Sequence, residues 1–149
     1  MQDPTVPYDV AGYLSEHLRP AQVSAVSPSG SPLLGSLWFL WADRKFWFSS
    51  VFDSPLVRAF QRGSEVAVLV DDFSPPADIR QVRVRGPAGV EVHDPDRVEE
   101  IYVRYLGADL DTWPVGFRNR LDDLSYVVWS VTPVSGLVAS FAHFKGDEA

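Results

Sequence analysis

The stretch Leu33–Trp41, which reads LLGSLWFLW, decides how the rest of the chain is interpreted. Successive side chains of a β-strand point to opposite faces, so Leu37 and Phe39 lie on one face while Trp38 and Leu40 lie on the other. Both faces are apolar, and water covers neither of them well. One face fits the interior of a small barrel. The other must be covered by helices of the same chain or by a second subunit, and we favour a homodimer with a ligand at the seam.

The segments on either side of this stretch alternate between strands and short helices. The remaining strands are predicted at Ala21–Ser27, Lys45–Ser50, Glu65–Asp71, Ile79–Val92 with a bend at Gly86-Pro87, Ser125–Thr132 and Val134–Phe144, and Asp72–Ala77 is predicted to be a loop. Helices are predicted at Val10–Arg19, between the cap Ser54 and Gly63, and between the cap Asp94 and Gly107, with a helical turn near Phe117–Leu121. The sequence therefore predicts a mainly β protein, with six or seven mostly antiparallel strands and three inserted helices in one domain spanning residues 1–149.

The composition excludes several classes of function. The chain has 149 residues, 20 acidic against 13 basic side chains, three histidines and no cysteine. A net charge of −7 argues against nucleic-acid binding, and the lack of cysteine excludes disulfides and thiol chemistry. No pair of histidines has the spacing of a metal site. The longest apolar run, Leu37–Ala42, is too short for a membrane helix, and no secretory signal is found, so a cytoplasmic location is expected.

The order of these segments resembles the pyridoxamine 5′-phosphate oxidase-like family of FMN-binding split barrels, including its flavin/deazaflavin oxidoreductase branch. The resemblance covers about Gly12–Lys145. It rests on the ordered combination of several short motifs, none of them specific alone: Val23–Pro32, Ser36-Leu37-Trp38-Phe39, Phe46–Ser50, Ser54–Arg58, Val66–Asp71, Val82–Ala88 and Val127–Pro133.

This resemblance implies a six-stranded antiparallel split β-barrel that forms a homodimer, with FMN or a deazaflavin coenzyme at the subunit interface. The isoalloxazine ring is then expected against Ser36, Leu37 and Trp38, and the phosphate is expected beside Ser49, Ser50, Ser54 and Arg58. Hydroxyls and a guanidinium are suitable phosphate ligands. The implied function is an oxidoreductase for a small organic substrate, in which the flavin carries the hydride chemistry and no catalytic side chain is required.

Two departures from the family pattern keep alternatives open. Many relatives carry a basic residue at the position of Leu56, where it pairs with the phosphate, and the usual aromatic-acidic ending of the last strand is replaced by Ala139–Phe144. A second hypothesis is therefore a non-catalytic binding module whose affinity for flavin is weakened or lost. A third hypothesis is haem binding, for which His143 is the first ligand to test.

Four further features have two interpretations each. Gln81, Arg83 and Arg85 share a strand face that either binds an anion or, as we favour, is solvated and paired with acidic neighbours. His17 lies on the apolar side of a helix, which favours packing over ligand binding. His93 adjoins a helix cap and is expected to be exposed. Trp113-Pro114 is either a lid over the cofactor or the anchor of a loop.

Overall fold

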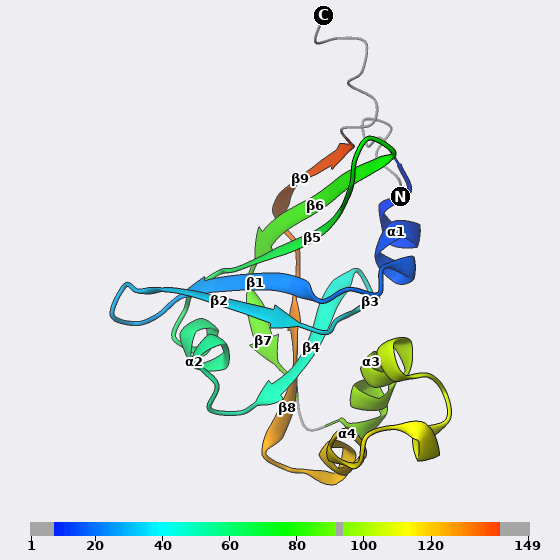
Figure 1. The fold of residues 1–149 in the computed structure, drawn as a ribbon. Helices are drawn as coiled ribbons and strands as arrows, with labels where there is room; N and C mark the ends of the chain where they lie inside the picture. The colour runs from blue at the N-terminus through cyan, green and yellow to red at the C-terminus, as the bar shows by residue number, and fades with distance from the viewer. Residues whose placement is uncertain (1–7, 92–93, 141–149) are drawn as a thin grey trace, which may run out of the picture.

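The computed structural model describes residues 8–91 and 94–140, and Figure 1 shows how their elements are arranged. The strands are β1 (Ala21–Val26), β2 (Pro32–Leu37), β3 (Leu40–Ala42), β4 (Lys45–Val51), β5 (Val66–Ser74), β6 (Asp78–Gly86), β7 (Ala88–Val90), β8 (Tyr126–Val131) and β9 (Ser135–Ser140). The helices are α1 (Val10–Glu16), α2 (Pro55–Gln61), α3 (Pro95–Leu106) and α4 (Val115–Asn119), with 3-10 turns at Leu110–Thr112 and Arg120–Asp122.

The strands form two antiparallel sheets. One sheet has the order β2-β1-β5-β6-β9 and the other the order β3-β4-β8-β7. In Figure 1, β4 and β8 run between α2 on one side and the pair α3 and α4 on the other. The predicted mainly β architecture with inserted helices is confirmed. No helix within the described part of the chain has both the length and the apolar character needed to cross a membrane.

Two predicted strands are each divided between the two sheets, which raises the number of described strands to nine. The bend predicted at Gly86-Pro87 is confirmed and separates β6 from β7. A Cβ atom on Gly86 would collide with the carbonyl oxygen of Thr132, so the close approach of these backbones requires glycine. The prediction of one continuous strand over Leu33–Trp41 is wrong, because β2 ends at Leu37 and β3 begins at Leu40.

Two other boundaries differ from the prediction. The first helix ends at Glu16 and not at Arg19, because His17 already has an extended backbone. The predicted loop Asp72–Ala77 is shorter, because β5 continues to Ser74 and pairs with β6 as far as Asp78. In that extension Asp72 lies opposite Arg80, and Arg80 pairs with Asp78 at 2.7 Å.

The apolar side chains form two clusters on opposite sides of β4. The larger cluster fills the space between the sheets and includes Phe39, Phe46, Phe48 and Trp129, all fully buried. The smaller cluster contains Trp47 and Val128 together with Ile101, Tyr102 and Trp113. Trp38 and Leu40 pack against it. The second apolar face of the stretch thus packs against α3 and the segment after it, which agrees with the alternative that helices of the same chain cover it. Trp47 is buried, and Trp38 and Leu40 are partly buried.

Side chains of α3 hold the break between β2 and β3. The amide N–H of Phe39 donates to the Tyr105 hydroxyl at 3.2 Å, and the Arg104 guanidinium donates to the Phe39 carbonyl oxygen. Arg104 also donates to the carbonyl oxygens of Leu14 at 3.0 Å and His17 at 2.6 Å. One arginine therefore satisfies backbone acceptors at the end of α1 and at the strand break.

His17 is packed rather than available to a ligand. It is 5% exposed, and its Nδ1 lies 3.1 Å from Oδ2 of Asp72 on β5. Its ring stacks near that of Phe39, with the two centroids 6.0 Å apart. This arrangement ties the end of α1 to the first sheet.

We predict that Arg104→Met lowers the free energy of unfolding by about 3 kcal/mol or more, because it leaves several buried carbonyl groups without donors. Urea unfolding followed by circular dichroism measures this loss. Arg62→Met, at the exposed end of α2, is the matched control and should change the free energy by no more than about 0.5 kcal/mol. A loss below about 1 kcal/mol in Arg104→Met would contradict the role given to Arg104.

The stability of the fold should fall at alkaline pH. Burial is the main reason that the pKa of Tyr8 is raised from 10.0 to about 12, and its hydroxyl donates to the Gln81 carbonyl oxygen at 2.9 Å. The folded state thus favours the neutral phenol, and the stabilisation is complete below pH 10 and is lost as the pH rises to about 12. Urea midpoints measured across this window should decline, and Tyr8→Phe should decline less steeply. Equal slopes for the two proteins would contradict this assignment.

Candidate functional site

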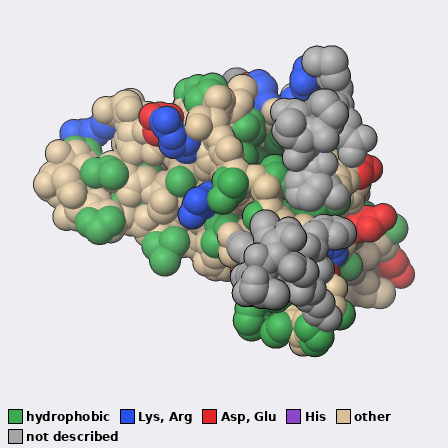
Figure 2. Space-filling model, turned by 90° about the horizontal axis from the view of Figure 1, so that it is seen from above, with side chains coloured by type: hydrophobic (Ala, Val, Ile, Leu, Met, Phe, Trp, Pro, Cys, Tyr) green, Lys and Arg blue, Asp and Glu red, His purple; other side chains and the backbone are tan. Residues whose placement is uncertain are grey.

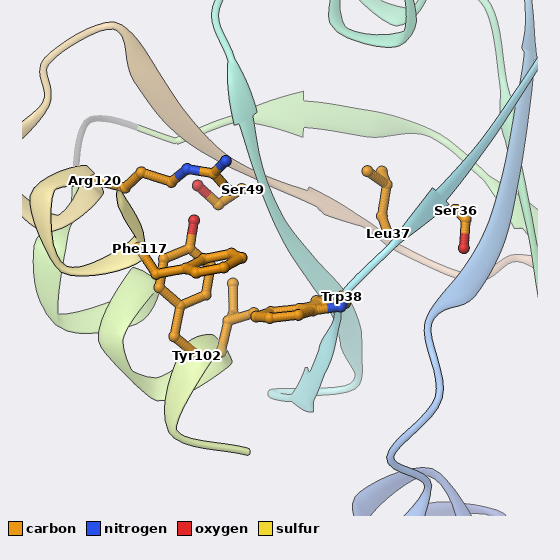
Figure 3. Close-up of a pocket in the computed structure, with 8 residues that line it drawn as sticks. Ser36, Leu37, Trp38, Ser49, Tyr102, Phe117 and Arg120 are labelled. Carbon is orange, nitrogen blue, oxygen red and sulfur yellow. The ribbon is translucent and has the colours of Figure 1, made fainter. Parts of the chain in front are cut away.

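A cavity of about 270 Å³ lies beside the end of β2, between that strand, β4 and the segment that contains α3 and α4 (Figure 3). Its lining combines serines, aliphatic and aromatic side chains and one arginine: Ser36, Leu37, Trp38, Ser49, Ile101, Tyr102, Phe117 and Arg120. Within residues 8–91 and 94–140, no acidic side chain belongs to this lining. Four of the seven residues expected to contact the cofactor, Ser36, Leu37, Trp38 and Ser49, therefore meet at one cavity.

An aromatic cluster forms one wall. The Trp38 ring stacks with Tyr105 at a centroid distance of 4.7 Å and with Phe117 at 4.9 Å, and Tyr102 meets it edge-on at 5.8 Å. Such ring contacts stabilise the fold by more than the burial of their apolar surface alone. Because α3 supplies both tyrosines and α4 supplies Phe117, the orientation of Trp38 is fixed by residues of its own chain.

Three polar side chains of the cavity, those of Ser49, Tyr102 and Arg120, lie near one another away from Ser36 (Figure 3). In Figure 3 the Arg120 guanidinium points toward the Ser49 hydroxyl, and the Tyr102 hydroxyl lies beside them. Ser49 Oγ is buried and has no hydrogen-bond partner among the described residues. None of the ion pairs that those residues form includes Arg120. As far as the described residues show, the cavity thus contains a cation that is in no ion pair and, next to it, a hydroxyl that has no hydrogen-bond partner.

Aromatic neighbours hold Arg120 in place. Its guanidinium lies 4.7 Å from the centroid of the Phe117 ring and 5.1 Å from that of Tyr126. Burial lowers the pKa of Arg120, but its hydrogen bond with Tyr102 and the charges of ionised Tyr102 and Tyr126 raise it, and the net change is upward. Arg120 therefore stays positively charged over the whole physiological range of pH.

The other three expected residues lie at the junction of β4 and α2. Ser50 Oγ accepts from the Trp129 indole N–H at 3.0 Å, and Ser54 Oγ caps α2 by accepting from the Val57 amide at 3.4 Å. Arg58 is exposed and takes part in none of the ion pairs among the described residues. Both hydroxyls keep their own protons for donation, so these residues fit a phosphate, although the structure does not place them in the cavity.

Leu56, which stands at the position where the resemblance implies a basic residue in many relatives, packs into the fold. It is partly buried against the larger cluster, and a Cβ atom on Gly35 would lie only 3.1 Å from its Cδ1 atom. Leu56 thus lies against the backbone of β2, two residues before the end of that strand.

The structure distinguishes between the two interpretations given for the Arg83 and Arg85 face and for Trp113. Arg85 pairs with Glu65 at 2.9 Å on an exposed face that also carries Arg83, as the favoured interpretation expected. Trp113 is buried and donates its indole N–H to the Gly107 carbonyl oxygen at 2.8 Å, so it anchors the loop. His93, His143 and the altered strand ending beyond Ser140 lie outside the described residues.

Sequence reasoning missed four residues of the cavity: Ile101, Tyr102, Phe117 and Arg120. Periodicity placed the first two on the apolar stripe of a helix, and it predicted the helical turn that carries the other two. A spacing of three residues puts Phe117 and Arg120 on one side of such a turn. Only the packing of this segment against β2 and β4 shows that both residues reach the cavity.

Comparisons with known proteins agree with this architecture. The model of the family described as "Pyridoxamine 5'-phosphate oxidase" matches residues 13–137. No curated protein matches the chain. Among solved structures, a conserved hypothetical protein from Mycobacterium tuberculosis has a TM-score of 0.72 at 17% identity, covering 95% of this chain and 90% of that one.

Two further structures show the range of proteins with this fold. An F420 reductase has a TM-score of 0.56 at 20% identity, covering 87% of this chain and 98% of that one. HutZ, the haem storage protein from Vibrio cholerae, has a TM-score of 0.68 at 11% identity, covering 87% of this chain and 91% of that one. At these identities the likeness shows the fold, and the expected split-barrel class is confirmed.

Proposed function

Because the chain belongs to the pyridoxamine 5′-phosphate oxidase family, we propose that it is a flavin- or deazaflavin-dependent oxidoreductase that acts on a small organic substrate. The observation that carries this proposal is the cavity beside β2, where Ser36, Leu37 and Trp38 meet Ser49, whose hydroxyl has no hydrogen-bond partner in the described part of the chain. The fold shared with an F420 reductase supports keeping a deazaflavin beside FMN as the cofactor.

In this proposal the cofactor ring lies along the end of β2. The Ser49 hydroxyl would bind a polar atom of the ring, and Ser50, Ser54 and Arg58 would hold the phosphate at the start of α2. The aromatic wall formed by Tyr102 and Phe117 would exclude water from one side. The bound flavin would supply the hydride chemistry, so the chain itself needs no acid, base or nucleophile.

We also propose that the site is completed by a second copy of the chain. The cavity of about 270 Å³ is smaller than the roughly 300–1,000 Å³ of typical ligand sites. The exposed face of the first sheet adjoins the cavity at Ser36. This face carries Leu34, which is 76% exposed, and Leu137, which is 46% exposed. Figure 2, which views the molecule from above, shows hydrophobic side chains exposed on that side of the molecule, with Lys or Arg side chains among them. A partner on the sheet face would enlarge the cavity.

Leu56 favours a second candidate function, a non-catalytic module that binds a ligand without turnover. An apolar side chain packed against Gly35 cannot pair with a phosphate. The two functions differ in redox behaviour. We expect an oxidoreductase to accelerate the reoxidation by menadione of bound cofactor that has been reduced with dithionite, compared with free cofactor. A binding module gives no such acceleration.

Titration of FMN and of a deazaflavin, followed by quenching of their fluorescence, tests the cofactor site. We expect micromolar binding, and we expect Arg58→Ala to weaken it about ten- to a hundredfold because a charge-assisted contact is lost. Arg62→Ala, which removes an exposed arginine from the end of the same helix, should leave the affinity unchanged. Absence of quenching for both cofactors at high micromolar protein would overturn the flavin proposal.

Substitution at Leu56 tests the position of the phosphate. Leu56→Lys restores a cation beside β2, and its aliphatic stem can follow the path of the leucine, so FMN should bind about tenfold more tightly. Leu56→Met keeps the volume without the charge and serves as the control. If the affinity for FMN is the same in all three proteins, the phosphate does not lie at this junction.

A further inference from the structure

We propose that the segment Pro114–Asn119, which contains α4, is a lid over the cavity, and that the Phe117 ring is the latch that holds this lid closed. Opening of the lid would admit a ligand to the cavity. The inference rests on the proposed function in one respect, because that function names the cofactor and the substrate as the ligands that would enter. The lid itself requires no flavin, and two of its tests use the free protein.

The first argument is the exposure of the lid. In Figure 1, α4 lies at the edge of the molecule beside α3. Apart from Phe117, each residue of Pro114–Asn119 is exposed to solvent, and Val115 is 63% exposed. A segment with few buried apolar side chains opens locally more readily than the core of the same protein. The packing of the lid on the rest of the fold therefore depends on one apolar side chain.

The second argument is the hydrogen bonding of the lid's backbone. The amides of Phe117 and Arg118 donate to the Pro114 carbonyl oxygen at 3.0 Å and 3.4 Å, so these bonds stay within the lid. Among the residues that the structure describes, no backbone hydrogen bond joins the lid to a strand or to α3. The ion pair of Arg118 with Asp111 is exposed and adds little. Outward movement of the lid therefore breaks no backbone bond of the sheets or of α3.

Residues on both sides of the lid are fixed to the fold. Trp113, which precedes the lid, is 4% exposed and donates its indole N–H to the Gly107 carbonyl oxygen at 2.8 Å. Leu121, which follows the lid, packs against the smaller apolar cluster. Further along the chain, the Phe52 amide donates to the Ser125 carbonyl oxygen at 2.8 Å. The lid can therefore move between two fixed points while the elements on either side stay folded.

The latch is the contact of the Phe117 ring with two other rings of the cavity wall. Phe117 stacks on Trp38 at a centroid distance of 4.9 Å and meets Tyr102 edge-on at 5.5 Å. In Figure 3 the Phe117 ring extends from the lid toward Trp38. Phe117 is also the residue through which α4 reaches the cavity. Aromatic pairs stabilise a structure only modestly, so contacts of one ring keep the lid closed and still allow it to open.

Native-state hydrogen exchange tests the lid in the wild-type protein. After correction for intrinsic rates, we expect the amides of Phe117 and Arg118 to exchange at least about a hundredfold faster than those of Ile101 and Tyr102 in α3. Low concentrations of urea should leave the exchange of the lid amides unchanged, because the lid opens without global unfolding. Equal protection of the two sets, or exchange of the lid amides only through global unfolding, overturns the inference.

A thiol placed in the cavity tests whether the lid controls access. The chain has no cysteine, so Ser49→Cys introduces a single thiol at a position that lines the cavity and whose Oγ atom is buried. When Phe117→Ala is added, N-ethylmaleimide should modify this thiol at least about tenfold faster, because the latch is lost. Mass spectrometry measures the rate.

Two controls accompany the thiol measurement. Val115→Ala truncates an exposed side chain of α4 outside the lining and should leave the rate within about twofold. Val66→Ala destabilises the larger cluster, where Val66 is fully buried, and should also leave the rate within about twofold, because it does not touch the lid. If Val66→Ala accelerates modification as much as Phe117→Ala, or if neither does, the inference is overturned. Urea unfolding verifies that each variant is folded, and hydrogen exchange decides the inference where one is not.

Stopped-flow mixing with FMN separates this inference from the proposed function. Phe117→Ala should raise the association rate constant of FMN severalfold or more, whereas Val115→Ala should leave it unchanged. If FMN binds and Phe117→Ala does not raise this constant, the lid does not control entry, so the inference is overturned and the proposed function stands. If neither FMN nor the deazaflavin binds the wild type, the proposed function fails, and hydrogen exchange and thiol modification decide the inference.

Discussion

The peptide groups of Phe39 are the point on which the arrangement of this protein depends. Phe39 lies between β2 and β3, where neither sheet provides a strand partner, and its side chain is fully buried. Tyr105 accepts from its N–H, and Arg104 donates to its carbonyl oxygen. Without these two bonds the buried backbone groups would be unsatisfied, which is costly in any fold. The helix α3 therefore makes it possible for one apolar stretch to pass from the first sheet to the second.

The hydrogen bonds between α3 and Phe39 link the packing of the fold to the candidate site. The helix that bonds Phe39 also carries Ile101 and Tyr102 into the cavity, and Tyr105 stacks on Trp38. The strand break brings Trp38 to the wall at the end of β2, and the same helix face then completes that wall. A change in the docking of α3 would thus alter the strand crossover and the shape of the cavity together.

How far the sequence predicted this structure depends on how local each signal is. The bend at Gly86-Pro87 was predictable, because glycine and proline mark it within the segment itself. The break at Trp38-Phe39 was not predictable, because both strand faces of LLGSLWFLW stay apolar across it. The hydrogen bonds that stabilise the break come from residues 65 and 66 positions away. The resemblance indicated Ser36, Leu37, Trp38 and Ser49, which do meet at one cavity. The resemblance gave no indication that Arg120 lines the cavity, because its position there depends on the fold of the segment after α3.

The positions of the charges bear on how a ligand would lie in the proposed site. The resemblance implies a basic residue in many relatives where this chain has Leu56, and Leu56 packs against Gly35 on β2. Arg58 is exposed and lies two residues further along α2, and residues two apart in a helix point away from each other, so the charge that Arg58 offers a phosphate lies on another side of α2 from Leu56. Among the described residues that line the cavity, Arg120, beyond α4, carries the positive charge.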